Sequence, residues 1–174
     1  MERKDRLNAL EIALENETKE REFYLANAER TANPLGKAMF ESIAAEELDH
    51  YERLKKLHDA WQKDGSWPET VPLKVKETNI RKVLASVVDK TADIPPADDD
   101  DLAALQKAIE FEARGVEFYR HLSSRLSDPK EQKFFSLLAG IEEEHYRSLK
   151  ETEEFLKDPA AWFRTTERGG LDGA

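Results

Sequence analysis

An internal repeat constrains the fold of this chain more than any other feature. Shifted against itself by 95 residues, the sequence aligns 7–62 with 102–157 without a gap and with 18 identities. Apolar residues recur at intervals of three and four through both copies, the spacing that places side chains on one face of a helix. We therefore predict two copies of one helical hairpin.

Four long helices are predicted, over residues 4–31, 34–63, 99–127 and 129–157. Asn33-Pro34 and Asp128-Pro129 are typical helix starts, because the first side chain caps the helix and proline is tolerated at the first helical position. We interpret the acidic run 98–101 as favourable charge at the start of the third long helix rather than as a cation site. Helices of this length span roughly 40 Å and are typical of a four-helix bundle.

The connection between the hairpins, residues 64–98, is far longer than the roughly 2–8 residues usual between adjacent antiparallel helices. We predict a crossover from one end of the bundle to the other, which leaves the second and third long helices parallel. An amphipathic pattern inside it predicts a short helix that packs on the bundle through Ile80, Val83, Leu84, Val87 and Val88.

The chain is expected to form a single all-α domain over residues 1–174. Its parts are hairpin one at 4–63, the crossover at 64–98, hairpin two at 99–157 and a tail at 158–174. The residues expected to pack at the bundle ends or to anchor the tail are Trp61, Trp67, Trp162 and Phe163.

Composition excludes several classes of function. A formal net charge of −10 argues against a nucleic-acid surface, because such surfaces depend on clustered lysine and arginine. The chain has no cysteine, which removes disulfides, thiolate metal sites and cysteine nucleophiles. No apolar stretch approaches a membrane span, and the charged start of the sequence is unlike a signal peptide. We therefore expect a soluble, cytoplasmic protein with no membrane or nucleic-acid partner.

Six ionisable residues occupy positions where the helices should be apolar: Glu17, Glu47, His50, Glu112, Glu142 and His145. Thirty residues separate Glu17 from Glu47, and thirty also separate Glu112 from Glu142, so all six should meet at one level. Unpaired buried charges cost several kcal/mol or more, so this cluster requires compensation. Two divalent cations balance four carboxylates when both imidazoles are neutral. We therefore predict a binuclear metal site.

The type of metal follows from the donor atoms. Glu-x-x-His places both side chains on one helix face, one turn apart, so the glutamate can bridge two ions while the histidine binds one. Carboxylates with two imidazoles favour iron or manganese, and zinc is an adventitious alternative. The neighbouring Glu46, Glu143 and Glu144 are expected to face solvent, and His58 and His121 are expected at the surface or the rim.

The chain resembles the rubrerythrin-like branch of the ferritin-like di-iron superfamily over about residues 4–157. The motifs that carry the resemblance are Glu17-x6-Tyr24, Glu47-x2-His50, Glu112-x6-Tyr119 and Glu142-x2-His145, with Ala-Glu-Glu-Leu-Asp-His and Ile-Glu-Glu-Glu-His around the later ligands. One Glu-x-x-His alone is a weak signal. Two of them, each preceded by a glutamate at identical spacing, are a specific one.

The resemblance implies a ferritin-like four-helix bundle with two iron ions that react with hydrogen peroxide or dioxygen. It makes Glu47 and Glu142 bridging ligands and Glu17 and Glu112 terminal ligands, and it gives one iron to each histidine. Rubrerythrins usually also carry a rubredoxin domain and a further glutamate three residues before the third-helix ligand. This chain has no cysteine and has Ile109 at that position, so electrons should come from an external donor such as a rubredoxin-like protein.

Two further features bear on the site. Tyr24 and Tyr119 are expected in the core, with each hydroxyl near a ligand carboxylate that could be its partner. The repeat is broken at Glu20, whose counterpart is Gly115. Either Glu20 turns to solvent and Gly115 relieves packing, or Glu20 is an additional, mobile metal ligand and Gly115 opens room for substrate.

Three function classes remain open. The first is a di-iron oxidoreductase of rubrerythrin type that reduces peroxide or dioxygen. The second is a ferroxidase or iron-storage subunit, because the six-residue ligand set resembles that of a bacterioferritin equally well. The third is a non-catalytic metal-binding module. A bundle of this kind could also form a homodimer.

Overall fold

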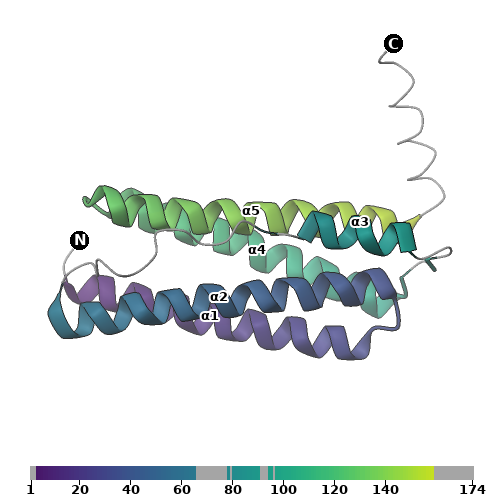
Figure 1. The fold of residues 1–174 in the computed structure, drawn as a ribbon, viewed down its shortest axis with the longest axis horizontal. Coiled ribbons are helices and arrows are strands. Elements are labelled where there is room, and N and C mark those ends of the chain that lie inside the picture. The colour runs from purple at the N-terminus through teal and green to yellow at the C-terminus, as the bar shows by residue number, and fades with distance from the viewer. Residues whose placement is uncertain (1–2, 66–77, 79, 91–93, 96, 159–174) are drawn as a thin grey trace, which may run out of the picture.

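The computed structural model describes residues 3–65, 78, 80–90, 94, 95 and 97–158, and this part of the chain is helical (Figure 1). The helices are α1 (Arg3–Arg30), α2 (Pro34–Asp64), α3 (Ile80–Lys90), α4 (Asp99–Arg125) and α5 (Pro129–Lys157). The four long helices begin and end within two residues of the predicted bounds. The predicted all-α class is therefore confirmed.

The helix ends follow from local chemistry. The side-chain oxygen of Asn33 accepts the amide of Leu35 at 3.0 Å, which caps α2 ahead of its proline. Asp128 caps α5 in the same way, and Asp98 caps α4, as the acidic run predicts. At the other end of α2, Gly65 adopts a left-handed φ of 65°, a conformation that favours glycine.

The four long helices form a bundle in which each hairpin packs on the other. α1 lies against α2 within the first hairpin and α4 against α5 within the second, while α1 also contacts α4 and α2 contacts α5. Arg6 pairs with Glu131 at 3.1 Å at one end of the bundle, and Arg30 pairs with Asp101 at 2.9 Å at the other. As Figure 1 shows, α2 and α4 run in the same direction.

The short helix α3 lies on α2 and α5, as the amphipathic pattern predicts. Ile80 is fully buried, and Leu84, Val87 and Val88 pack against the core. Trp67, Trp162 and Phe163 lie outside the described residues, as do 66–77, 79, 91–93 and 96 of the crossover and 159–174 of the tail.

Two apolar clusters fill the bundle on either side of a polar middle. One is centred on Phe40, Leu105 and Leu149, and the other on Leu54 and Phe134. None of the described helices is long and apolar enough to cross a membrane.

Candidate metal centre

The six predicted ligands meet in the middle of the bundle. Each is at most 2% exposed, and they come from all four long helices: Glu17 on α1, Glu47 and His50 on α2, Glu112 on α4, and Glu142 and His145 on α5. The 30-residue spacing between successive ligand glutamates therefore places them at one level, as expected.

The six side chains form two overlapping groups. One group is Glu17, Glu47, His50 and Glu142, and the other is Glu47, Glu112, Glu142 and His145. Within each group the ligand atoms lie within 4.8 Å of one another. Because Glu47 and Glu142 belong to both groups, the arrangement suits two ions that share two carboxylates.

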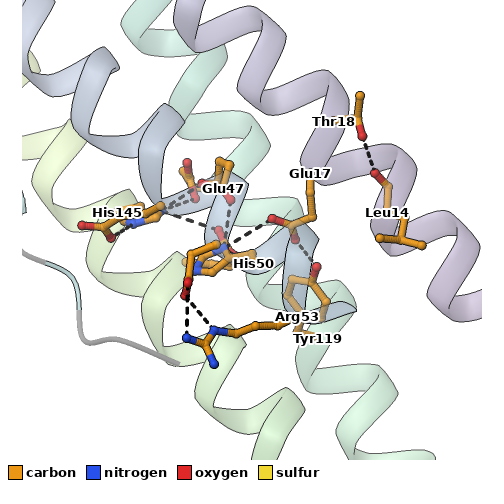
Figure 2. A network of polar contacts seen from close by, with 12 residues as sticks. Leu14, Glu17, Thr18, Glu47, His50, Arg53, Tyr119 and His145 are labelled. Carbon is orange, nitrogen blue, oxygen red and sulfur yellow. Dashed lines mark hydrogen bonds and ion pairs between the residues drawn. The ribbon is translucent and has the colours of Figure 1, made fainter. Parts of the chain in front are cut away.

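The first group is built around one ring nitrogen of His50. Its Nδ1 lies 2.9 Å from Oε2 of Glu47, 3.3 Å from Oε2 of Glu17 and 3.5 Å from Oε1 of Glu142. Figure 2 shows the Glu17 carboxylate reaching from its helix between His50 and Tyr119. Three carboxylates therefore converge on one imidazole nitrogen.

The second group repeats this arrangement around His145. Its Nδ1 lies 3.3 Å from Oε1 of Glu47, 3.4 Å from Oε2 of Glu112 and 3.8 Å from Oε2 of Glu142. The two imidazole rings face each other with centroids 6.0 Å apart (Figure 2). The repeat in the sequence is therefore also a repeat in the geometry of the site.

The unpaired atoms of this cluster fit a pair of metal ions. Among the described residues, several buried atoms have no hydrogen-bond partner: Glu17 Oε2, Glu47 Oε1, Glu112 Oε2, both carboxylate oxygens of Glu142, and His145 Nδ1. A buried polar atom without a partner is costly, and a cation that binds these oxygens and nitrogens removes the cost. Oxygen donors with two imidazoles suit iron or manganese.

The comparison with protein families agrees with the geometry. Residues 8–93 match the family model described as Rubrerythrin. This part of the chain is rubrerythrin-like. The match covers most of α1 and all of α2 and α3, and it confirms the resemblance carried by the motifs at Glu17 and Glu47. No curated protein and no solved structure matched the chain significantly. Family and site together make this rubrerythrin-like chain a candidate di-iron carboxylate protein.

Burial and the neighbouring charges together determine the acid–base behaviour of the cluster. Burial, followed by the charge of Glu47, raises the pKa of Glu17 to about 8. Burial and the charges of Glu47 and Glu112 likewise raise the pKa of Glu142 well above its ordinary value. Burial lowers the pKa of His50, but the carboxylates of Glu47 and Glu17 together outweigh it and raise this pKa to about 10. The metal-free cluster thus holds protons that binding of cations would release.

Each tyrosine of the rubrerythrin-like motifs serves the opposite half of the bundle. The Tyr24 hydroxyl on α1 donates to Oε1 of Glu112 on α4, and the Tyr119 hydroxyl on α4 donates to Oε1 of Glu17 on α1. Both tyrosines are buried, as expected. The partner is the ligand on the other hairpin rather than the one two turns away on the same helix.

The two halves of the bundle differ near the site at Glu20 and its counterpart Gly115. Glu20 is half-buried rather than fully exposed, and burial, with the charges of Glu112 and Glu47, raises its pKa to about 10. Gly115 lies against Glu142: a Cβ added there would come within 3.3 Å of Glu142 Cγ. Gly115 therefore makes room for a predicted ligand, and Glu20 is close enough to interact with the cluster.

Glu46 is the residue that sequence reasoning missed. Expected to face solvent, it is instead partly buried, with 22% of its side chain exposed, and its Oε2 lies 2.8 Å from Nε2 of His145. The repeat contained a signal for this difference, because the residue that corresponds to Glu46 in the second half is the apolar Ile141. Of the other residues expected at the surface or the rim, His121 is exposed, whereas His58, Glu143 and Glu144 are half-buried, with 13%, 38% and 33% of their side chains exposed.

Proposed function

We propose that this chain is a di-iron oxidoreductase of rubrerythrin type, which reduces hydrogen peroxide or dioxygen with electrons from an external donor. One observation carries the proposal: two buried ligand groups share Glu47 and Glu142 within a chain that matches the rubrerythrin family. Glu47 and Glu142 would hold both ions, and two ions held by shared carboxylates would supply the chemistry for reduction of an O–O bond.

The residues have separable roles in this proposal. Glu17 and Glu112 each complete one ligand group, and their tyrosine partners fix their orientation. The two apolar clusters keep bulk water away from the site. When bound, the iron ions would supply the electrons that reduce the O–O bond. Reduction of one peroxide to two waters consumes two electrons and two protons.

The electron donor is proposed to be a separate redox protein, of rubredoxin-like chemistry. None of the 174 residues is a cysteine, so this chain offers no thiolate-bound iron centre of its own. The observed site likewise offers only carboxylate and imidazole ligands. A second copy of the chain as a homodimer partner is also part of the proposal.

Rapid mixing tests the reaction directly. Protein loaded anaerobically with two Fe²⁺ per chain is mixed in a stopped-flow instrument with peroxide or with dioxygen, and oxidation is followed by absorbance. We expect rapid oxidation by at least one of them and repeated turnover when a reduced rubredoxin-like donor is present. Sluggish oxidation by both would contradict the proposal, and failure to bind iron would favour a non-catalytic module.

Glu20 is proposed as an additional, mobile carboxylate ligand. Its half-buried position and the influence of Glu112 and Glu47 on its pKa support this role. Replacing Glu20 with alanine should slow peroxide turnover, whereas replacing the exposed Glu22 on the same helix should not. Unchanged iron binding and turnover in Glu20→Ala would show that Glu20 is not a metal ligand.

A ferroxidase or iron-storage subunit is the second candidate, and one observation favours it. Ile109, where rubrerythrins usually have a further glutamate, is a buried core residue only 8% exposed. The remaining six-residue set is therefore also that of a bacterioferritin-like site. Size-exclusion chromatography discriminates, because a 20.0 kDa chain that elutes as a small oligomer encloses no cavity for mineral.

A further inference from the structure

We propose that Glu46 makes the two metal positions unequal, so that the position containing His145 binds its ion more tightly than the position containing His50. The proposal rests on the proposed function only in requiring that two ions bind. It assigns Glu46 a positioning role, because its carboxylate acts through His145 rather than on the ions themselves.

The geometry places His145 between two sets of acceptors. Its Nδ1 faces the carboxylates of Glu47, Glu112 and Glu142, and its Nε2 lies 2.8 Å from Oε2 of Glu46. A carboxylate only accepts hydrogen bonds, so Nε2 must carry a proton and donate it to Glu46. The lone pair of Nδ1 is then the one that remains for a metal ion.

The corresponding position in the other half cannot act in this way. The repeat pairs His145 with His50 and pairs Glu46 with Ile141. Ile141 is 4% exposed and belongs to one of the apolar clusters. An isoleucine side chain has no hydrogen-bond acceptor, so the first ligand group lacks a carboxylate at this position.

This difference should appear in metal affinity. A carboxylate that accepts the second N–H of a ligand histidine fixes the ring orientation and makes the ligating nitrogen more basic, and loss of such a partner typically weakens metal binding by about 10–100-fold. Glu46 is also partly exposed, so water solvates its carboxylate and its negative charge avoids the full cost of burial. The group of Glu47, Glu112, Glu142 and His145 should therefore be occupied first.

Anaerobic titration with Co²⁺ tests the proposal without any turnover, because the visible absorption of Co²⁺ reports each bound ion. The wild-type chain should bind two Co²⁺ in two resolved steps. Glu46→Leu should weaken the tighter step by about 10–100-fold and leave the weaker step unchanged. Glu46→Gln, which keeps an acceptor oxygen but loses the charge, should give a smaller loss. The matched control is Glu52→Gln, an exposed glutamate on the same helix.

A double-mutant cycle shows whether Glu46 acts through His145. In a His145→Ala background, Glu46→Leu should have no further effect on Co²⁺ binding. In a His50→Ala background, it should still weaken the remaining tight step by about 10–100-fold. Circular dichroism confirms that each variant is folded, and Glu46→Gln supplies the measurement should the leucine variant fail to fold.

Three outcomes would overturn the inference: two equal Co²⁺ steps in the wild type, equal weakening of both steps in Glu46→Leu, or an undiminished effect of Glu46→Leu in the His145→Ala background. Failure of the proposed function looks different. A wild-type chain that binds two ions unequally but does not react with peroxide or dioxygen would refute the function and leave the role of Glu46 intact.

Discussion

The Tyr24 hydroxyl on α1 donates a hydrogen bond to the Glu112 carboxylate on α4, across the interface between the two hairpins. The mirror-image contact runs from Tyr119 on α4 to Glu17 on α1. Each terminal carboxylate is thus oriented by the hairpin that does not carry it. The site and the packing of the two repeats are therefore coupled.

Replacing Tyr24 with phenylalanine should weaken metal binding at the Glu112 position while the fold is retained. The change removes one hydrogen bond to a charged group, worth about 1.5–3 kcal/mol, and leaves the ring packed in the core. Titration with Fe²⁺ under anaerobic conditions measures the loss. Tyr51→Phe on α2, a half-buried tyrosine outside the ligand groups, is the control. Equal losses in both variants would show that the Tyr24 hydroxyl has no special part in the site.

Removal of a shared ligand should have a larger effect than removal of a terminal one. Glu142 belongs to both ligand groups, whereas Glu17 belongs to one. Glu142→Leu should abolish binding of both ions, and Glu17→Leu should leave one ion bound. Metal analysis after desalting measures the stoichiometry. One retained ion in Glu142→Leu would mean that this carboxylate does not bridge the two positions.

The same pair of variants separates metal binding from stability. Fe²⁺ at about 100 times its dissociation constant should add about 2.7 kcal/mol per bound ion to the free energy of unfolding of the wild type, which binds two ions, and it should add nothing to Glu142→Leu. Without metal, Glu142→Leu should not be less stable than the wild type, because both Glu142 oxygens lack a hydrogen-bond partner among the described residues. Denaturant unfolding with and without a chelator measures both quantities.

The metal-free protein should lose stability as the pH rises above neutrality. The pKa of Glu17 rises from 4.5 to about 8, so the native carboxyl keeps a proton that the unfolded chain has lost. The pKa of His50 rises from 6.5 to about 10, so between these two pH values native His50 keeps a proton that the unfolded chain has lost. In both cases the native state binds more protons than the unfolded state, and stability therefore falls with rising pH.

Thermal unfolding at several pH values from 6.5 to about 8, the interval in which both groups hold an extra proton in the native state, measures this trend. With chelator present the midpoint should fall as the pH rises. With metal bound the trend should be weaker, because cations replace the protons and their binding improves as the ligands deprotonate. A metal-free midpoint that rises with pH would contradict the proton balance inferred for the cluster.

Much of this site could be predicted from the sequence because it replaces apolar residues in a regular pattern. Glu17, Glu47 and Glu112 occupy positions in helical seams that are otherwise apolar, and helical periodicity fixes which face a side chain occupies. The repeat then fixes the level at which the two halves meet. The turns of the two hairpins could be predicted from local chemistry, because Asn33 and Asp128 cap the helices that follow them.

Periodicity could not predict contacts that depend on the distance between helices. Glu46 lies one position from a ligand and therefore belongs to the flank of the α2 seam, where its carboxylate reaches His145 only because α5 packs beside α2. The tyrosine partners show the same limit: a seam places Tyr24 in the core, but only the packing of α1 on α4 selects Glu112 as its acceptor.

Replacing Gly115 with alanine should affect helix stability and metal binding in opposite directions. Gly115 lies within α4, where replacement of glycine by alanine usually adds about 1 kcal/mol to helix stability. A Cβ at this position would lie 3.3 Å from Cγ and 3.5 Å from Cδ of Glu142, so that carboxylate would have to move by a few tenths of an ångström. Because Glu142 belongs to both ligand groups, Gly115→Ala should weaken binding of both ions.

Gly140 on α5 is the matched control, because an added Cβ would meet nothing within 4 Å. Gly140→Ala should therefore raise the free energy of unfolding by about 1 kcal/mol and leave the metal titration unchanged. Gly115→Ala should show a smaller stability gain together with weaker binding, because the helix preference is offset by displacement of Glu142. Identical metal titrations in the two variants would show that the site tolerates movement of this carboxylate, and Gly115 would then serve only the packing of α4 on α5.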